Sequence, residues 1–309
     1  MDWRKEERLP RIVPNVLIRH DPVAAAVPVI FDSPHSGAVY PADFDFAAPF
    51  AVMRRAEDAF VDELFESAPR HGAGLLAALF PRSYVDPNRH EHDVDPKLLA
   101  EPWPDPVIAS DHGRRGLGVV RRLVRSTVPV YCRQLSIAEV QARLSHYHQP
   151  YHRELRSMID AAHDRFGAVW HINCHSMKST AKGHPRADFV LGDRHGTTCE
   201  GEFTEFVATT LRDLGYSVAL NHPFKGAELV ARHGDPAGGR HSLQIEINRG
   251  LYMDEERIER SPGFAPLQAD IDRLIAATVR YVGKAVATRT APPGFVPRDC
   301  APDRTADGA

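Results

Sequence analysis

Short apolar runs alternate with segments of helical periodicity along most of this chain of 309 residues. Such runs, bounded by turn residues, predict strands at 27–32, 75–80, 83–85, 168–174, 187–191, 216–220 and 242–247. Apolar residues recur at helical spacing over 54–68, 136–166, 199–214 and 264–287, which predicts helices. No linker-like break or internal repeat interrupts this order. The alternation favours one α/β domain built on a largely buried mixed sheet.

The two ends of the chain lack this patterning. Residues 1–20 are polar and predict an irregular arm, and residues 288–309, rich in Pro, Asp and Ala, predict a flexible tail. The expected catalytic domain therefore spans residues 21–287. Within it, Ser136 and Glu139 fit a capping box, and Pro150 should kink or split the helix that follows. Regular patterning also fades between residues 86 and 126, and a loop this long in a compact domain is usually functional or disordered.

Composition excludes several classes of protein. A formal net charge of −3 gives no global field that favours nucleic acid or an anionic membrane. No apolar stretch approaches the roughly 18–20 residues that span a bilayer, and the charged start is followed by no secretory apolar core. The four cysteines form no close pair. We therefore expect a cytoplasmic protein with free thiols and no nucleic-acid or membrane partner.

Two of the predicted strands run into histidines. The run from residue 27 leads to His35, and the run from residue 169 ends at His175. A histidine at the carboxyl end of a buried strand is a form that metal ligands take, although a lone histidine there is more often structural. His171 shares the strand face of His175 but lies deeper, which predicts a supporting or core residue. Cys174 should point to the opposite face as a buried structural thiol.

A carboxylate would complete a metal site. Glu57, Asp58 and Asp62 lie at the start of the helix predicted over 54–68, where the helix dipole also favours negative charge, so capping is the alternative explanation. Two imidazoles and one carboxylate form a common zinc set that leaves a position open for water.

Glu246 is a separate candidate, because it alternates with Ile245 and Ile247 in a predicted strand. A carboxylate buried there costs several kcal/mol unless it is paired or lies at a site. At such a site it could move a proton between water and a leaving amine. The alternative is that it belongs to the solvated face of an edge strand.

Arginines near the long loop indicate a site for anions. Arg89 fits a substrate carboxylate, because the guanidinium fork matches its geometry with two parallel bonds. Nearby His90 and His92 indicate a second metal site or, more simply, a solvated loop. A basic stretch with Gly-Leu-Gly follows, formed by Arg114, Arg115, Arg121, Arg122 and Arg125. It has no interleaved aromatics, so an anion-binding lid fits better than a nucleic-acid contact. The chain carries no phosphate loop and no Gly-x-Ser-x-Gly elbow.

Taken together, these segments resemble the N-formylglutamate amidohydrolase family. The matching motifs are Ser-Pro-His-Ser-Gly at 33–37, Glu-Asp-x-x-Val-Asp at 57–62, Tyr-Val-Asp-x-Asn-Arg at 84–89, Gly-Leu-Gly at 116–118, Gln-Pro-Tyr-His at 149–152, Cys-His-Ser-Met at 174–177, Asp-Phe-Val-Leu-Gly at 188–192, Phe-Lys-Gly at 224–226, Arg-His at 232–233, Gln-Ile-Glu at 244–246 and Tyr-Met-Asp at 252–254. Each motif is short, but the ordered set is specific and covers nearly the whole chain. The family is distantly similar to zinc carboxypeptidases and aspartoacylases. The resemblance implies a single-domain, phosphorylase/hydrolase-like mixed sheet flanked by helices.

The resemblance also implies an activity and roles for residues. It implies hydrolysis of N-formyl-L-glutamate, a small anionic N-acyl amino acid, to formate and glutamate by metal-activated water, as in histidine breakdown. By position, the ligands of a divalent metal, expected to be Zn²⁺, would be His35, Asp58 and His175, with Asp58 favoured over Glu57. Glu246 would act as general base and then acid, and an arginine such as Arg89 would help to stabilise the oxyanion. The residues implied to bind substrate are Asn88, Arg89, Arg232 and His233.

Two segments near the proposed pocket depart from the family pattern. These segments are residues 246–250 and the charged loop 90–95. Because of them, the resemblance does not decide which acyl group and which amino acid make up the substrate. One alternative is a carboxypeptidase-like or aspartoacylase-like hydrolase of another N-acyl amino acid or a short peptide. Another is a non-catalytic relative that binds a small ligand, which predicts ligand-induced stabilisation without product.

Overall fold

The fold is built on an eight-stranded mixed sheet with the strand order β1-β2-β4-β3-β7-β12-β10-β11. The computed structural model describes residues 9–290, apart from residues 109, 126 and 182. The strands are β1 (Arg11–Val13), β2 (Leu17–His20), β3 (Val29–Ser33), β4 (Gly74–Ala78), β7 (Val169–Met177), β10 (Phe189–Gly192), β11 (Val218–Leu220) and β12 (Arg240–Asn248). This architecture confirms the predicted single-domain mixed sheet flanked by helices.

The central strands of the sheet share one direction. β4, β3, β7 and β12 are parallel neighbours, whereas β10 runs antiparallel to β12. The carboxyl ends of the four parallel strands therefore meet at one edge of the sheet. Ligands bind at such edges because the loops that leave the strands converge there.

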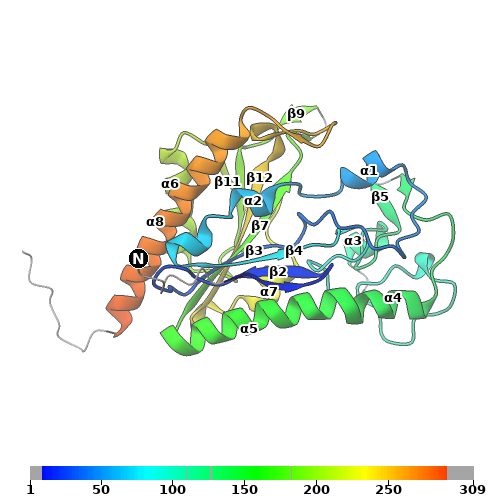
Figure 1. The fold of residues 1–309 in the computed structure, drawn as a ribbon, viewed down its shortest axis with the longest axis horizontal. Coiled ribbons are helices and arrows are strands. Elements are labelled where there is room, and N and C mark those ends of the chain that lie inside the picture. The colour runs from blue at the N-terminus through cyan, green and yellow to red at the C-terminus, as the bar shows by residue number, and fades with distance from the viewer. Residues whose placement is uncertain (1–8, 109, 126, 182, 291–309) are drawn as a thin grey trace, which may run out of the picture.

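Helices cover both faces of the sheet (Figure 1). α2 (Val61–Leu64), α6 (Gly201–Asp213) and α8 (Phe264–Thr290) lie on one face, and α5 (Gln149–Phe166) and α7 (Glu228–His233) lie on the other. Alternation along β3 explains how one strand serves both layers, because Phe31 packs into the first core and Ile30 into the second.

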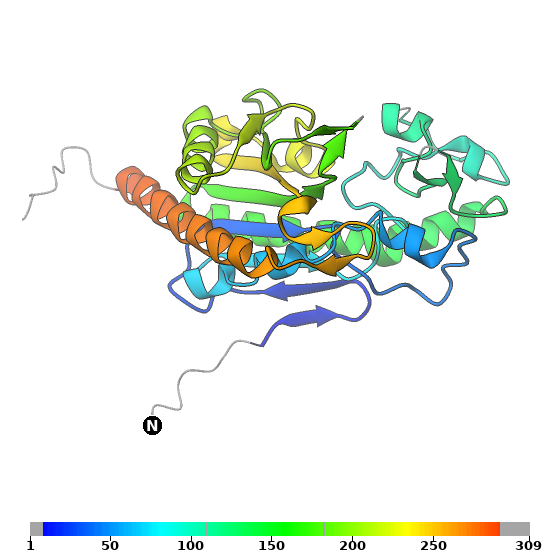
Figure 2. The same ribbon diagram turned by 90° about the horizontal axis from the view of Figure 1, so that it is seen from above.

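Much of the segment between β4 and α5 forms a lobe beyond one end of the sheet (Figure 2). Its elements are a 3₁₀ turn at Pro96–Leu98, α3 (Asp111–Arg114), the hairpin β5 (Leu123–Arg125) and β6 (Val128–Pro129), and α4 (Ile137–Arg143), with α1 (Phe50–Arg54) beside them. Buried Tyr84, Val119 and Leu135 join this lobe to the core beneath the sheet.

The remaining elements are short. They are the hairpins β8 (Thr180–Ala181) with β9 (His184–Pro185) and β13 (Met253–Asp254) with β14 (Glu259–Arg260), and 3₁₀ turns at Ala68–His71, Pro236–Gly238 and Arg249–Leu251. No helix in the described part of the chain is long and apolar enough to cross a membrane.

Most predicted elements are confirmed, and four need correction. Residues 11–20 are not an irregular arm but a hairpin that extends the sheet, while residues 1–8 and 291–309 lie outside the described residues. Residues 83–85 form a turn rather than a strand. The helix predicted over 54–68 is interrupted between α1 and α2, which leaves Glu57 and Asp58 in a loop. The Gly-rich segment 224–240 contains α7, which was not predicted.

The predicted long helix is divided as Pro150 suggested. The Ser136–Glu139 capping box is present at the start of α4. A π-helical turn at Leu144–His148 then separates α4 from α5, and Pro150 occupies the first turn of α5. Proline is tolerated there because it lacks only an N–H that has no partner within a new helix.

Candidate functional site

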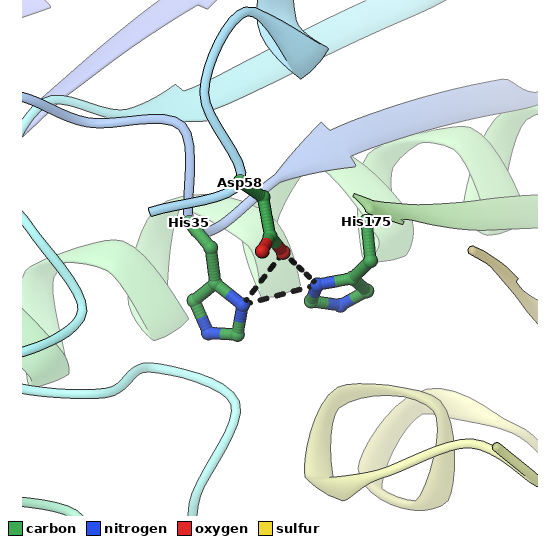
Figure 3. Close-up of side chains that lie close together, drawn as sticks. All are labelled: His35, Asp58 and His175. Atoms are coloured by element: carbon green, nitrogen blue, oxygen red, sulfur yellow. Dashed lines mark hydrogen bonds and ion pairs between the residues drawn. The ribbon is translucent and has the colours of Figure 1, made fainter. Parts of the chain in front are cut away.

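Three side chains from distant segments meet at the carboxyl edge of the sheet (Figure 3). Nδ1 of His35 lies 3.0 Å from Nδ1 of His175, and the two nitrogens lie 3.3 and 3.0 Å from Oδ2 of Asp58. All three residues are buried. They form the one group of three or more His, Cys, Asp or Glu side chains among the described residues that could hold a metal ion.

His35 is held from behind by a carboxylate. The loop after β3 carries His35, and its Nε2 lies 2.7 Å from Oδ1 of Asp86, which follows β4. A deprotonated carboxylate only accepts, so Nε2 carries the proton and Nδ1 presents a lone pair. Arg82 and Arg121 approach the other oxygen of Asp86. Burial acts to raise the pKa of Asp86, but Arg82 and His35 outweigh it and hold the pKa well below its usual value.

His175 is held from behind by an amide. Its Nε2 lies 2.6 Å from Oδ1 of Asn173, its neighbour on the same face of β7. The amide nitrogen of Asn173 donates to Asp32, which leaves Oδ1 to accept from His175. Nδ2 of Asn88 also lies 3.0 Å from Nε2 of His175, but the contact with Asn173 is shorter and favours a proton on Nε2, which leaves a lone pair on Nδ1. As predicted, His171 is a supporting residue on the same face, where it contacts Asp32 and Ser242, while Cys174 packs into the opposite core.

Asp58 completes a set of acceptors that lacks a donor. Oδ1 of Asp58 accepts from Nη2 of Arg249 at 2.8 Å, which turns Oδ2 toward the two imidazoles. Burial acts to raise the pKa of Asp58, but the contacts with His175 and His35 and the charge of Arg82 hold it well below its usual value. Two imidazole lone pairs and a carboxylate oxygen that converge within 3.3 Å require a positive centre between them. The donor set therefore fits a divalent cation.

Glu246 faces the same site from β12, the strand beside β7. It is paired with His175 in the β7–β12 register and accepts a hydrogen bond of 2.9 Å from Gln244. β12 is a central strand, so the alternative of a solvated edge strand is wrong. Burial raises the pKa of Glu246 to about 7, and the negative charge of Asp58 adds to this rise against the lowering effects of His175, Arg82 and Arg249.

These groups line one cavity of about 850 Å³, large enough for a small organic molecule. Arg89 also lines it, and its guanidinium donates to the carbonyl oxygens of Asn88 and Leu117. Burial lowers the pKa of Arg89, and no carboxylate of the described residues forms a hydrogen bond with it. Of the basic stretch expected as a lid, Arg121 lines the cavity.

The predicted substrate-binding residues are only partly brought together. Asn88 lines the cavity, and its Oδ1 accepts from the backbone N–H of Leu229. Arg232 and His233 are not among the lining residues. Arg232 is paired with Glu91 at 2.7 Å and with Glu228 at 2.8 Å.

Sequence reasoning missed several residues that hold the site together. Asp86, Asn173 and Arg249 each contact one of the three converging side chains. Two of them carried a usable signal. Asp86 directly follows the run 83–85, which was predicted as a strand although it forms a turn, and Asn173 alternates with His171 and His175 on β7. No sequence pattern pointed to Arg249, because it lies 191 positions from Asp58 along the chain and only the fold brings the two side chains together.

Known proteins share both the sequence pattern and the fold. The family model for N-formylglutamate amidohydrolase matches residues 27–253. The N-formylglutamate deformylase of Pseudomonas putida is 27% identical over 268 residues, which cover 82% of this chain and 93% of that protein. The protein of the same name from Pseudomonas aeruginosa is 27% identical over 239 residues, covering 74% and 84%.

A solved structure gives the same result. The crystal structure of N-formylglutamate amidohydrolase from Ralstonia eutropha JMP134 superimposes with a TM-score of 0.85 and 46% identity. The alignment covers 88% of this chain and 99% of that one. The match therefore includes the lobe as well as the sheet. The chain belongs to the N-formylglutamate amidohydrolase family.

Proposed function

We propose that this protein is a metal-dependent amidohydrolase that cleaves N-formyl-L-glutamate, or a similarly small N-acyl amino acid. The observation that carries the proposal is the position of Glu246. This buried carboxylate, with a pKa of about 7, lines the same cavity as three converging acceptor atoms. The activities named for the relatives from Pseudomonas and Ralstonia support the choice of substrate.

His35, Asp58 and His175 would hold the cation, and zinc is the metal that such a set of two imidazoles and one carboxylate commonly binds. A divalent cation bound there supplies a Lewis acid that polarises the substrate carbonyl and lowers the pKa of water. The protein's contribution is to keep both Nδ1 atoms unprotonated. It does so through the acceptors behind each ring, Asp86 and Asn173.

Glu246 moves the proton during the reaction. In its ionised form it takes a proton from the attacking water, whose oxygen adds to the carbonyl carbon. The same carboxyl group then gives that proton to the amide nitrogen as the C–N bond breaks, which releases formate and the amino acid. Burial raises the pKa of Glu246 to about 7 in metal-free protein, and a bound cation would lower it, so the carboxylate is ready to accept a proton at neutral pH.

Arg89 binds a carboxylate of the substrate. It is a partly buried cation with two carbonyl acceptors and no hydrogen bond to a carboxylate of the described residues, so an anion that enters the cavity stabilises it. A role in stabilising the oxyanion is open to the same guanidinium. Substrate binding by Arg232 and His233 stays a prediction, since Arg232 would first have to exchange Glu91 for the substrate.

The proposal is tested with purified protein, metal analysis and a substrate panel. We expect about one equivalent of divalent metal and hydrolysis of N-formyl-L-glutamate that is lost on chelation and restored by zinc. Full activity after exhaustive chelation would exclude the metal-dependent mechanism. Hydrolysis of N-acetyl-L-aspartate or a dipeptide in preference to N-formyl-L-glutamate would favour the other hydrolase classes. Ligand-induced stabilisation without product would favour a non-catalytic relative.

A further inference from the structure

Asp86 is fully buried, and among the described residues its carboxylate has hydrogen-bond partners that all donate. Oδ1 lies 2.7 Å from Nε2 of His35 and accepts from the backbone N–H of Asn88 at 3.0 Å. Oδ2 accepts from Nη2 of Arg82 at 2.9 Å and from Nη2 of Arg121 at 3.2 Å. Only a group with two acceptor oxygens satisfies all of these donors at once.

The backbone that carries Asp86 is held rigidly. The N–H of Asp86 donates to the carbonyl of Val119 at 2.7 Å. Next along the chain, the carbonyls of Pro87 and Arg89 lie 2.8 and 2.9 Å from Nε2 of His152 and His148. Those two imidazoles are buried and pack with their ring centroids 4.2 Å apart. Asp86 therefore cannot turn away from His35 without the loss of several contacts.

We propose that Asp86 is a positioning residue that fixes the tautomer of His35 with the proton on Nε2, and so keeps Nδ1 available to a cation. An asparagine at this position has the same shape but one NH₂ group. Arginine cannot accept a hydrogen bond, whereas a neutral imidazole can. At the Oδ2 position the NH₂ group would meet the guanidinium donors of Arg82 and Arg121, whereas at the Oδ1 position it would meet one backbone N–H, that of Asn88, and an imidazole that can accept. The NH₂ group would therefore face His35, whose proton would move to Nδ1. Asp86→Asn thus blocks the metal position without any change in the residues that line it.

The tautomer of His35 can be measured without an activity assay. Long-range ¹H–¹⁵N correlation spectra of metal-free protein, with His35 assigned by comparison with His35→Gln, distinguish the two tautomers. We expect Nε2–H in the unmodified protein and Nδ1–H in Asp86→Asn. Competition with a chromophoric chelator should show zinc affinity lowered about 10- to 100-fold, the range for partners that lie behind a ligand. Asp95→Asn is the matched control. It removes a buried carboxylate of the same lobe, paired with Arg122, that contacts neither imidazole.

Several results would overturn this inference. One is an Nε2 of His35 that carries no proton in the unmodified metal-free protein, a result that needs no variant that might misfold. Others are an unchanged tautomer in Asp86→Asn, or zinc affinity equal to that of Asp95→Asn. The inference rests on the proposed function for its biological meaning, but the two can fail separately. Protein that binds zinc through the expected tautomer yet leaves N-formyl-L-glutamate intact would refute the proposed activity and keep the role of Asp86.

Discussion

Asp58 and Glu246 are two buried carboxylates that line one cavity, yet their surroundings push their pKa values in opposite directions. The pKa of Asp58 lies well below its usual value, because its contacts with His175 and His35 and the charge of Arg82 outweigh burial. The pKa of Glu246 rises to about 7, because burial dominates and its one hydrogen bond comes from the neutral amide of Gln244. Divergent environments of this kind separate a permanent anion from a group that exchanges protons.

Asp58 and Glu246 also differ in the structural elements that carry them. Asp58 lies in a loop whose backbone is tied to the carbonyl of His35, so it moves with the ligand that it faces. Glu246 lies in a central strand, in register with His175, and is fixed relative to the other imidazole. The expected division is that Asp58 binds the cation and Glu246 transfers the proton. The predictions that follow test this division.

The largest effect is expected for Asp58→Asn. The amide removes the one anionic ligand and places an NH₂ group within reach of the two imidazoles. We expect loss of bound metal and a fall in kcat/KM of more than about 10⁴-fold, since both the cation and the proton transfer that depends on it are lost. Metal content by mass spectrometry and steady-state kinetics check this. Retention of one equivalent of tightly bound metal would contradict the role assigned to Asp58.

Glu246→Gln should separate the two carboxylates. The substitution keeps the shape and an oxygen that can accept from Gln244, but it removes the group that carries the proton. We expect kcat to fall about 10²- to 10⁴-fold with metal content unchanged. In the unmodified enzyme, kcat/KM should fall as the pH drops through the pKa of Glu246, because protonation removes the base. The bound cation should place that pKa below the value of about 7 in metal-free protein, and this acidic limb should be absent from the variant. Equal loss of metal from both variants would remove the distinction between Asp58 and Glu246.

Much of the sheet and of the site could be predicted from sequence, for a physical reason that does not extend to the lobe. Strands such as β3 and β7 are local apolar runs, and their direction in an α/β fold brings His35 and His175 to one edge. Asp58 was predicted to lie at the start of a helix, but the structure has a loop at that point. That departure frees its side chain to reach both imidazoles.

The lobe could not be predicted because its structure depends on long-range contacts. Its backbone is ordered by pairs such as His152 with Pro87 and Arg122 with Asp95, which leave no periodic signal in the sequence. The pairing of Arg232 with Glu91, 141 positions away, likewise leaves no signal in the sequence, and the substrate role that the resemblance implies for Arg232 stays a prediction.

A smaller effect should appear in stability rather than activity. For a carboxyl group whose folded pKa is raised from 4.5 to about 7, stability is present below pH 4.5 and is lost as pH rises to 7. Metal-free Glu246→Gln has no titrating carboxyl group at this position, so its stability does not fall in this pH range for that reason. Its free energy of unfolding, relative to the metal-free parent, should therefore increase by about 3 kcal/mol between pH 4.5 and 8. Urea titrations at several pH values measure this difference, and a constant difference would show that Glu246 titrates normally.

The smallest effect is expected for Arg249→Lys. Arg249 donates to Oδ1 of Asp58 at 2.8 Å and to Oγ of Ser176 at 3.0 Å, and so ties the loop of Asp58 to the strand of His175. A lysine keeps the charge but lacks the planar fork that makes both bonds at once. We expect zinc affinity to fall about tenfold, with the acidic limb of kcat/KM unchanged. Arg54→Lys is a suitable control, because Arg54 pairs with Glu57 beside Asp58 without contact to Asp58 itself. The contrary result is a shifted acidic limb in Arg249→Lys with unchanged zinc affinity. It would mean that Arg249 acts on Glu246, so that Asp58 and Glu246 are not independent of each other.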